Sequence, residues 1–202
     1  MAMTQQEEKR EGGRVFGAVI FAAILALVAL VPSLSAKETF KARMLTGKGS
    51  FDNPQINLRI EVDSWTTADE INLLQAAMDQ GGFNAFETAF TQAKKGIVRF
   101  MTPQGRGLTI HAALSIPDDK GRRILLFFNH EAWDSGSQFM EGFNANYMVM
   151  DFTLDEKGGG EGRFYEFAEV QLKPEKGTIE MPSFSAAPKT LPIVQETTKK
   201  KK

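Results

Sequence analysis

Residues 55–63 alternate strictly between polar and apolar side chains, and this pattern constrains the fold more than any other part of the chain. The apolar members are Ile56, Leu58, Ile60 and Val62, and each is flanked by polar residues. Successive side chains of a β-strand point to opposite faces of its sheet, so the alternation predicts a strand with one buried face. The chain must therefore build a sheet whose apolar side packs against another layer.

Further apolar segments bounded by turn-forming residues predict more strands. In the segment 108–116, apolar residues recur at every second position and are expected to share one face. The segment 124–128 is apolar without interruption, which predicts a central strand covered on both faces. The other predicted strands are 39–45, 97–101, 147–154, 163–172 and 178–181, with a glycine-rich hairpin turn at 158–162.

After Trp65 the apolar period changes from two to about 3.6 residues, which indicates helix. Thr67 and Glu70 have the spacing of a capping box, and Gly81 with Gly82 provides a stop signal. These signals predict helices near 68–80 and 85–95, which together form a helical hairpin inserted among the strands.

The predicted elements favour an α+β fold that is mainly antiparallel β. We expect a meander of about seven or eight strands that forms a barrel or sandwich, with the helical hairpin at one end or over one face. A single β-rich domain would cover 37–181. The remainder, 182–202, contains three prolines and the terminal lysines and is predicted to be a flexible tail.

The apolar run at 15–31, VFGAVIFAAILALVALV, precedes this domain and predicts an apolar helix. Residues 1–36 have the features of a signal peptide cleaved after Ser35 or Ala36, or of an uncleaved membrane anchor. Either reading predicts an exported protein, periplasmic, secreted or anchored facing outward. The membrane would be contacted only through 15–31, and only if the segment is retained.

Composition limits the partners and cofactors. The formal net charge is −1, which lacks the basic excess of a nucleic-acid-binding protein, so no nucleic acid partner is expected. The chain has no cysteine, which excludes zinc–thiolate sites, and no cofactor is expected.

The segment 130–146 is the longest without clear periodicity inside the predicted domain, and long irregular loops often carry function. It mixes large apolar side chains with polar ones, as expected for a ligand gate or a partner-binding surface. The alternative is that these side chains simply close one end of the core. The candidate binding residues are Trp133, Phe139, Met140 and Phe143.

The two histidines, His111 and His130, are expected on neighbouring elements, with Glu131 and Asp134 nearby. These four residues are weak candidates for a metal or acid–base site, because two histidines without a third ligand at typical spacing are common in structural roles. No catalytic motif was found, which favours a non-catalytic protein over an enzyme.

Three segments of the chain, DSWTTADEINLLQAAMDQGG, GEGRFYEFAEVQL and IEMPSF, occur in this order after the leader. With the predicted strands, they resemble a group of small exported bacterial proteins that has no assigned activity. The resemblance covers most of 40–181. It implies a shared fold and export and brings no catalytic residue.

Two functions follow from these observations. The first is an exported, non-catalytic binding module whose interior accepts an apolar small molecule or acyl chain, gated by the loop at 130–146. The alternative is an envelope protein that acts through protein–protein contacts, at a sheet edge or at the same loop.

Overall fold

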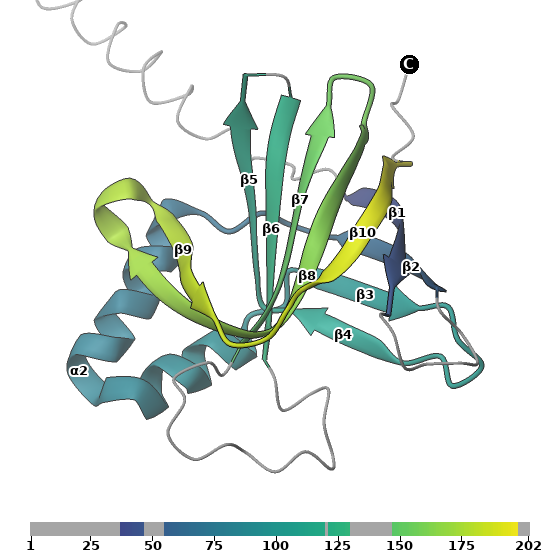
Figure 1. Ribbon diagram of the computed structural model, residues 1–202. Helices are drawn as coiled ribbons and strands as arrows, with labels where there is room; N and C mark the ends of the chain where they lie inside the picture. The colour runs from purple at the N-terminus through teal and green to yellow at the C-terminus, as the bar shows by residue number, and fades with distance from the viewer. Residues whose placement is uncertain (1–36, 47–54, 120, 130–146, 198–202) are drawn as a thin grey trace, which may run out of the picture. The chain divides into compact units, whose positions relative to one another are not determined.

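The computed structural model describes residues 37–46, 55–119, 121–129 and 147–197 (Figure 1). In chain order its elements are β1 (Glu38–Leu45), β2 (Gln55–Val62), α2 (Ala68–Gln92), β3 (Gly96–Phe100), β4 (Gly107–Ile110), β5 (Ala112–Asp118), β6 (Gly121–Asn129), β7 (Tyr147–Asp155), β8 (Gly159–Lys173), the short 3₁₀ helix η2 (Pro174–Lys176), β9 (Thr178–Phe184) and β10 (Lys189–Glu196).

The strands form one antiparallel sheet with the order β4-β3-β2-β1-β10-β8-β7-β6-β5, and β9 pairs with β8 beside this path. A mainly antiparallel α+β fold is thereby confirmed. The alternating segment 55–63 is β2, in which Leu58, Ile60 and Val62 are buried as expected.

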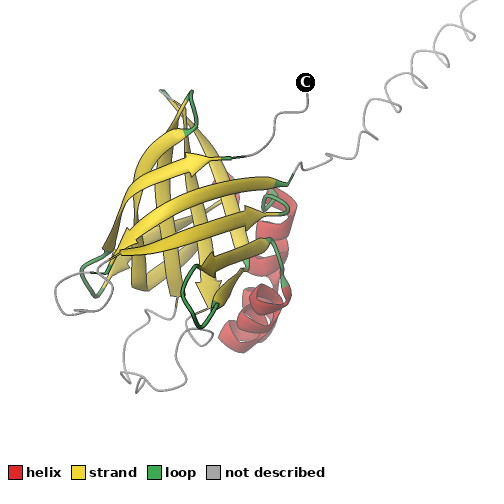
Figure 2. Cartoon of the chain, turned by 90° about the vertical axis from the view of Figure 1, so that its right-hand side faces the viewer, coloured by secondary structure: helices red, strands yellow, loops and turns green. Residues whose placement is uncertain are grey.

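The expected barrel or sandwich is a single open sheet that does not close into a barrel. The ends of the hydrogen-bonded order are β4 and β5. These two strands follow each other in the chain with only His111 between them, so they continue one path instead of pairing side by side. The sheet nevertheless curls strongly, as Figure 2 shows.

An inner core fills the concave side of the curled sheet. Its members come from β1 to β8 and from β10, and large aromatic side chains such as Phe40 and Phe152 meet edge to face with ring centroids 5.5 Å apart. The inner core consists of Phe40, Ala42, Met44, Leu58, Ile60, Val62, Val98, Phe100, Leu108, Ile110, Ala113, Ile124, Leu126, Phe128, Met148, Met150, Phe152, Leu154, Phe164, Leu191 and Val194.

An outer core lies between the other face of the sheet and α2. It consists of Ile71, Leu74, Phe86, Phe90, Ala112, Leu114, Leu125, Phe127, Tyr147, Val149, Tyr165, Ala168 and Ile179. Strand β6 contributes to both cores, with Leu126 facing inward and Phe127 outward. The prediction that 124–128 is covered on both faces is therefore confirmed.

His111 switches the buried face of the strand path. Before it, Leu108 and Ile110 belong to the inner core, whereas after it Ala112 and Leu114 belong to the outer core. The expectation that 108–116 shares one face is wrong, because one irregular residue reverses the two-residue alternation.

The region of the expected helical hairpin is the single helix α2, in which two helical segments meet at a kink at Gly82, within the predicted stop at Gly81 and Gly82. Gly82 has φ 66° and ψ −161°, a backbone conformation that glycine adopts far more readily than other residues. The expected capping box of Thr67 and Glu70 is present at the start. The helix ends at Gln92, not Lys95, because Ala93 is extended and Lys95 is buried against Glu70.

The predicted flexible tail at 182–202 is wrong in its central part, because β10 lies between β1 and β8. Leu191 and Val194 are buried in the inner core. Between them the register with β8 shifts, so Pro192 stands in an irregular stretch of the ladder where its missing N–H is tolerated.

Arg122 links three strands at one end of the inner core. Its guanidinium donates to the carboxylates of Glu38 on β1, at 2.5 Å, and Glu196 on β10, at 2.9 Å. It also lies 5.7 Å from the ring centre of Phe40 and 5.9 Å from that of Trp65. Burial lowers the pKa of Arg122, but the two carboxylates outweigh this effect and raise the pKa above its ordinary value.

The predicted signal or anchor at 1–36 lies outside the described residues. No helix within the described part of the chain combines the length and apolar character needed to cross a membrane.

We expect Arg122→Ala to lower the free energy of unfolding by about 2 kcal/mol, because it leaves two partly buried carboxylates beside each other without their cation. Urea unfolding of the full chain, followed by far-UV circular dichroism, measures this loss. Arg123→Ala is the matched control, since Arg123 is more exposed and, within the described part of the chain, forms its ion pair with the single carboxylate of Asp151. Its expected loss is below about 1 kcal/mol, and equal losses for the two variants would contradict the role given to Arg122.

Candidate functional site

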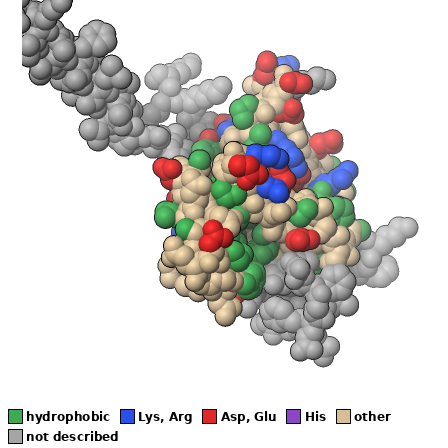
Figure 3. Space-filling model, turned by 90° about the vertical axis from the view of Figure 1, so that its left-hand side faces the viewer, with side chains coloured by type: hydrophobic (Ala, Val, Ile, Leu, Met, Phe, Trp, Pro, Cys, Tyr) green, Lys and Arg blue, Asp and Glu red, His purple; other side chains and the backbone are tan. Residues whose placement is uncertain are grey.

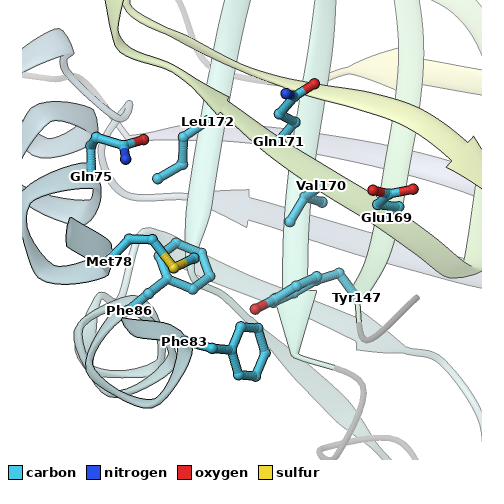
Figure 4. Close-up of a pocket in the computed structure, with 9 residues that line it drawn as sticks. All are labelled: Gln75, Met78, Phe83, Phe86, Tyr147, Glu169, Val170, Gln171 and Leu172. Carbon is cyan, nitrogen blue, oxygen red and sulfur yellow. The ribbon is translucent and has the colours of Figure 1, made fainter. Parts of the chain in front are cut away.

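A groove of about 500 Å³ lies between α2 and the second half of β8. The helix contributes side chains from both sides of its kink, and β8 contributes consecutive residues (Figure 4). The groove is lined by Gln75, Met78, Phe83, Phe86, Tyr147, Glu169, Val170, Gln171 and Leu172. Figure 3 views the side of the domain on which α2 lies and shows hydrophobic side chains reaching the surface there. Leu73 and Phe83 of α2 are among the exposed apolar residues.

The kink at Gly82 and the packing of the following segment give the groove its shape. Phe86 and Phe90 stack on each other with ring centroids 5.8 Å apart. Both meet the ring of Tyr147 edge-on, at 6.2 Å and 5.3 Å. These contacts hold the C-terminal part of α2 on β7. Across Tyr147, Met78 and Phe83 face Val170 and Leu172 of β8 (Figure 4).

The hydroxyl of Tyr147 is directed into this groove (Figure 4) and has no hydrogen-bond partner among the residues that the structure describes. The residue is only 3% exposed. Burial raises the pKa of Tyr147 well above its ordinary value, and the negative charge of Glu87 adds to this shift. The side chain therefore remains a neutral phenol, which can donate a hydrogen bond at any physiological pH.

The polar groups at the edge of the groove are two amides and one carboxylate. Ser183 donates a hydrogen bond of 2.8 Å to Glu169, which holds that carboxylate toward β9. Gln75 donates to Asp79 at 2.7 Å on the exposed side of α2. Among the described residues that line the groove, Glu169 is the only charged one. The arrangement offers apolar contact and one buried donor, which suits binding rather than a covalent step.

The sequence-predicted binding residues Trp133, Phe139, Met140 and Phe143 lie outside the described residues, and their role remains a prediction. The same holds for His130, Glu131 and Asp134. Among the residues that the structure describes, no group of three or more potential ligands could hold a metal ion.

His111 lies within the described residues and is buried. Its Nδ1 lies 2.8 Å from the backbone oxygen of Ala93, and its ring lies 5.3 Å from that of Phe90. A carbonyl oxygen only accepts hydrogen bonds, so Nδ1 carries a proton. Burial lowers the pKa of His111 below its ordinary 6.5; the Ala93 carbonyl opposes this shift and Lys94 reinforces it. These contacts connect the end of α2 to the irregular point between β4 and β5.

Sequence reasoning placed Phe86 within the predicted helix at 85–95 and Tyr147 at the start of the predicted strand at 147–154, but did not bring them together. One signal was available: the chain has 16 phenylalanines and only two tyrosines. In a chain that otherwise uses phenylalanine, a tyrosine at the start of an apolar strand indicates a hydroxyl group within the core.

Comparisons with known proteins found no match: no protein-family model, no curated protein and no solved structure is significantly similar to this chain. The site must therefore be interpreted from its own chemistry.

We expect Tyr147→Phe to raise the free energy of unfolding by about 1 kcal/mol, because it keeps the ring and removes a buried hydroxyl for which the described residues offer no partner. Urea unfolding of the ligand-free full chain tests this. Tyr165→Phe is the matched control: Tyr165 is also buried, but its hydroxyl is not among the buried groups without a partner. A loss of stability in Tyr147→Phe would mean that the hydroxyl is satisfied in the folded chain.

We expect the free energy of unfolding to fall as the pH is lowered from about 7.5 to about 5, in part because of His111. The unfolded chain takes up a proton near the ordinary histidine pKa, whereas the folded chain keeps His111 neutral to lower pH. The stability that the neutral form contributes is therefore complete above the unfolded pKa and declines below it. Urea unfolding across this range should show a smaller slope for His111→Gln than for the unaltered chain, and identical slopes would contradict the assignment.

Proposed function

We propose that this chain is a non-catalytic binding protein that takes an apolar small molecule or acyl chain into the groove between α2 and β8. The observation that carries the proposal is the buried hydroxyl of Tyr147, which points toward the lining side chains Met78, Phe83 and Phe86 and has no partner among the described residues. A buried hydroxyl without a hydrogen bond lowers the stability of the folded state. A ligand atom that accepts this hydrogen bond would offset that cost.

The inner core supports placing the ligand outside the curl of the sheet instead of within it. Side chains from facing strands occupy that space, and Phe40, Phe128 and Phe164 are completely buried there. The groove, in contrast, has a volume within the range of about 300–1,000 Å³ that is usual for small-molecule sites, and its walls combine apolar and polar surface in about equal parts.

Export remains part of the proposal, because the leader at 1–36 predicts it. An exported binding protein of this kind would meet its ligand in the periplasm, in the medium or at the outer face of a membrane. Lipids and envelope proteins are both present in those places. A ligand-binding role requires the groove to take up a small molecule, whereas a role in protein contacts requires a surface that a partner protein covers.

A titration with Nile red, an uncharged probe whose fluorescence rises in apolar surroundings, tests the proposal on the full chain. We expect saturable binding that Val170→Trp weakens by roughly tenfold or more, because the larger side chain occupies the space between β8 and α2. Ile193→Trp is the matched control, since Ile193 is also a β-branched strand residue but lies half exposed on β10, away from the groove.

Circular dichroism of both variants verifies that they fold. Equal probe binding by the two variants would exclude the groove as the site. Absence of any saturable binding would contradict the proposal and favour the alternative function through protein–protein contacts.

A further inference from the structure

The groove combines one deep hydrogen-bond donor with an edge that is negatively charged. Tyr147 lies at its base, and the walls above it are formed by apolar side chains such as Met78, Phe83 and Leu172. A ligand that reaches Tyr147 must place a polar atom there and leave its apolar part along these walls. The polar atom must accept a hydrogen bond, because the phenol offers a proton.

The charge around the groove opposes a ligand anion. Glu169 is the only charged residue among the described lining residues, and Glu87 is close enough to act on the phenol of Tyr147. The neighbouring lysines are directed elsewhere: Lys176 pairs with Glu180 at 2.9 Å, and Lys173 also interacts with that carboxylate. A carboxylate at the base of the groove would lose its hydration without gaining a cation.

We infer that the ligand of this groove is an uncharged amphiphile, in which an ester, ketone or ether oxygen accepts the Tyr147 hydrogen bond and an apolar chain lies along α2 and β8, and that the groove rejects the corresponding carboxylate. This inference rests on the proposed function and specifies its ligand class. A carboxylate would receive a stronger hydrogen bond from the phenol than an ester does. One such bond does not outweigh the lost hydration and the repulsion by Glu169.

Competition of methyl octanoate and octanoate against Nile red, with the full chain near neutral pH, tests the inference. The two competitors carry the same acyl chain and differ in charge. We expect methyl octanoate to bind at least about tenfold more tightly than octanoate. The affinity of the probe is measured separately for each variant, so that competition is corrected for changes in probe binding.

Two variants assign the selectivity to residues. Tyr147→Phe should weaken methyl octanoate by about fivefold and leave the binding of butylbenzene, which has no acceptor oxygen, unchanged. Glu169→Gln should improve octanoate binding and leave methyl octanoate unchanged. Glu161→Gln removes the same charge from an exposed position of β8 outside the groove, and it should alter neither ligand.

The possible failures are distinguishable. If octanoate binds as tightly as methyl octanoate, the inferred ligand class is wrong while the binding function stands. The same conclusion follows if the Tyr147→Phe variant binds methyl octanoate and octanoate as tightly as the unaltered chain does. If neither competitor nor Nile red binds, the proposed function fails and the inference with it.

Discussion

One partly buried guanidinium holds together strands that are distant in sequence. Arg122 on β6 reaches the carboxylates of Glu38 on β1 and Glu196 on β10, and it lies against the aromatic rings of Phe40 and Trp65. These contacts are possible only because the sheet curls, so that β1 and β10 stand across the inner core from β6. If the Arg122 guanidinium moved away or lost one partner, at least one partly buried carboxylate would be left without a cation. The guanidinium thus joins β6 to β1 and β10 across one end of the inner core and contacts Trp65 in the segment leading into α2.

The separation of the two cores places the candidate site on the outer face. Strand β6 is covered on both sides, and the change of face at His111 directs Ala112 and Leu114 toward α2. The inner core is packed with side chains, whereas the outer core leaves a groove where α2 kinks away from β8. Tyr147 belongs to the outer core through its ring and to the groove through its hydroxyl. The ring of Tyr147 therefore stabilises the layer by packing, whereas its hydroxyl finds no hydrogen-bond partner among the described residues, which costs stability.

The sequence predicted the features that depend on local patterns. The alternation in 55–63, the capping box at Thr67 and Glu70 and the doubly covered strand at 124–128 all follow from side chains a few residues apart. It did not predict the irregularity at His111, since no residue type there signals an interrupted alternation. Strand β10 was missed because Pro192 suggests a tail unless the shift in its ladder is known. The groove was missed for a different reason: its walls come from α2, β7 and β8, and only the tertiary fold brings these segments together.

The position of β10 also governs when this domain can form. The strand is the last one that the structure describes, yet it stands in the interior of the sheet, hydrogen-bonded to β1 on one side and β8 on the other. Until residues 189–196 have emerged from the ribosome, β1 and β8 have no common neighbour and Glu196 cannot reach Arg122. The sheet therefore cannot be completed before β10 has been synthesised, although β1 and β8 precede it in the chain. Contacts of such large sequence separation form slowly, so the joining of β1 to β8 through β10 is expected to be a late step in folding.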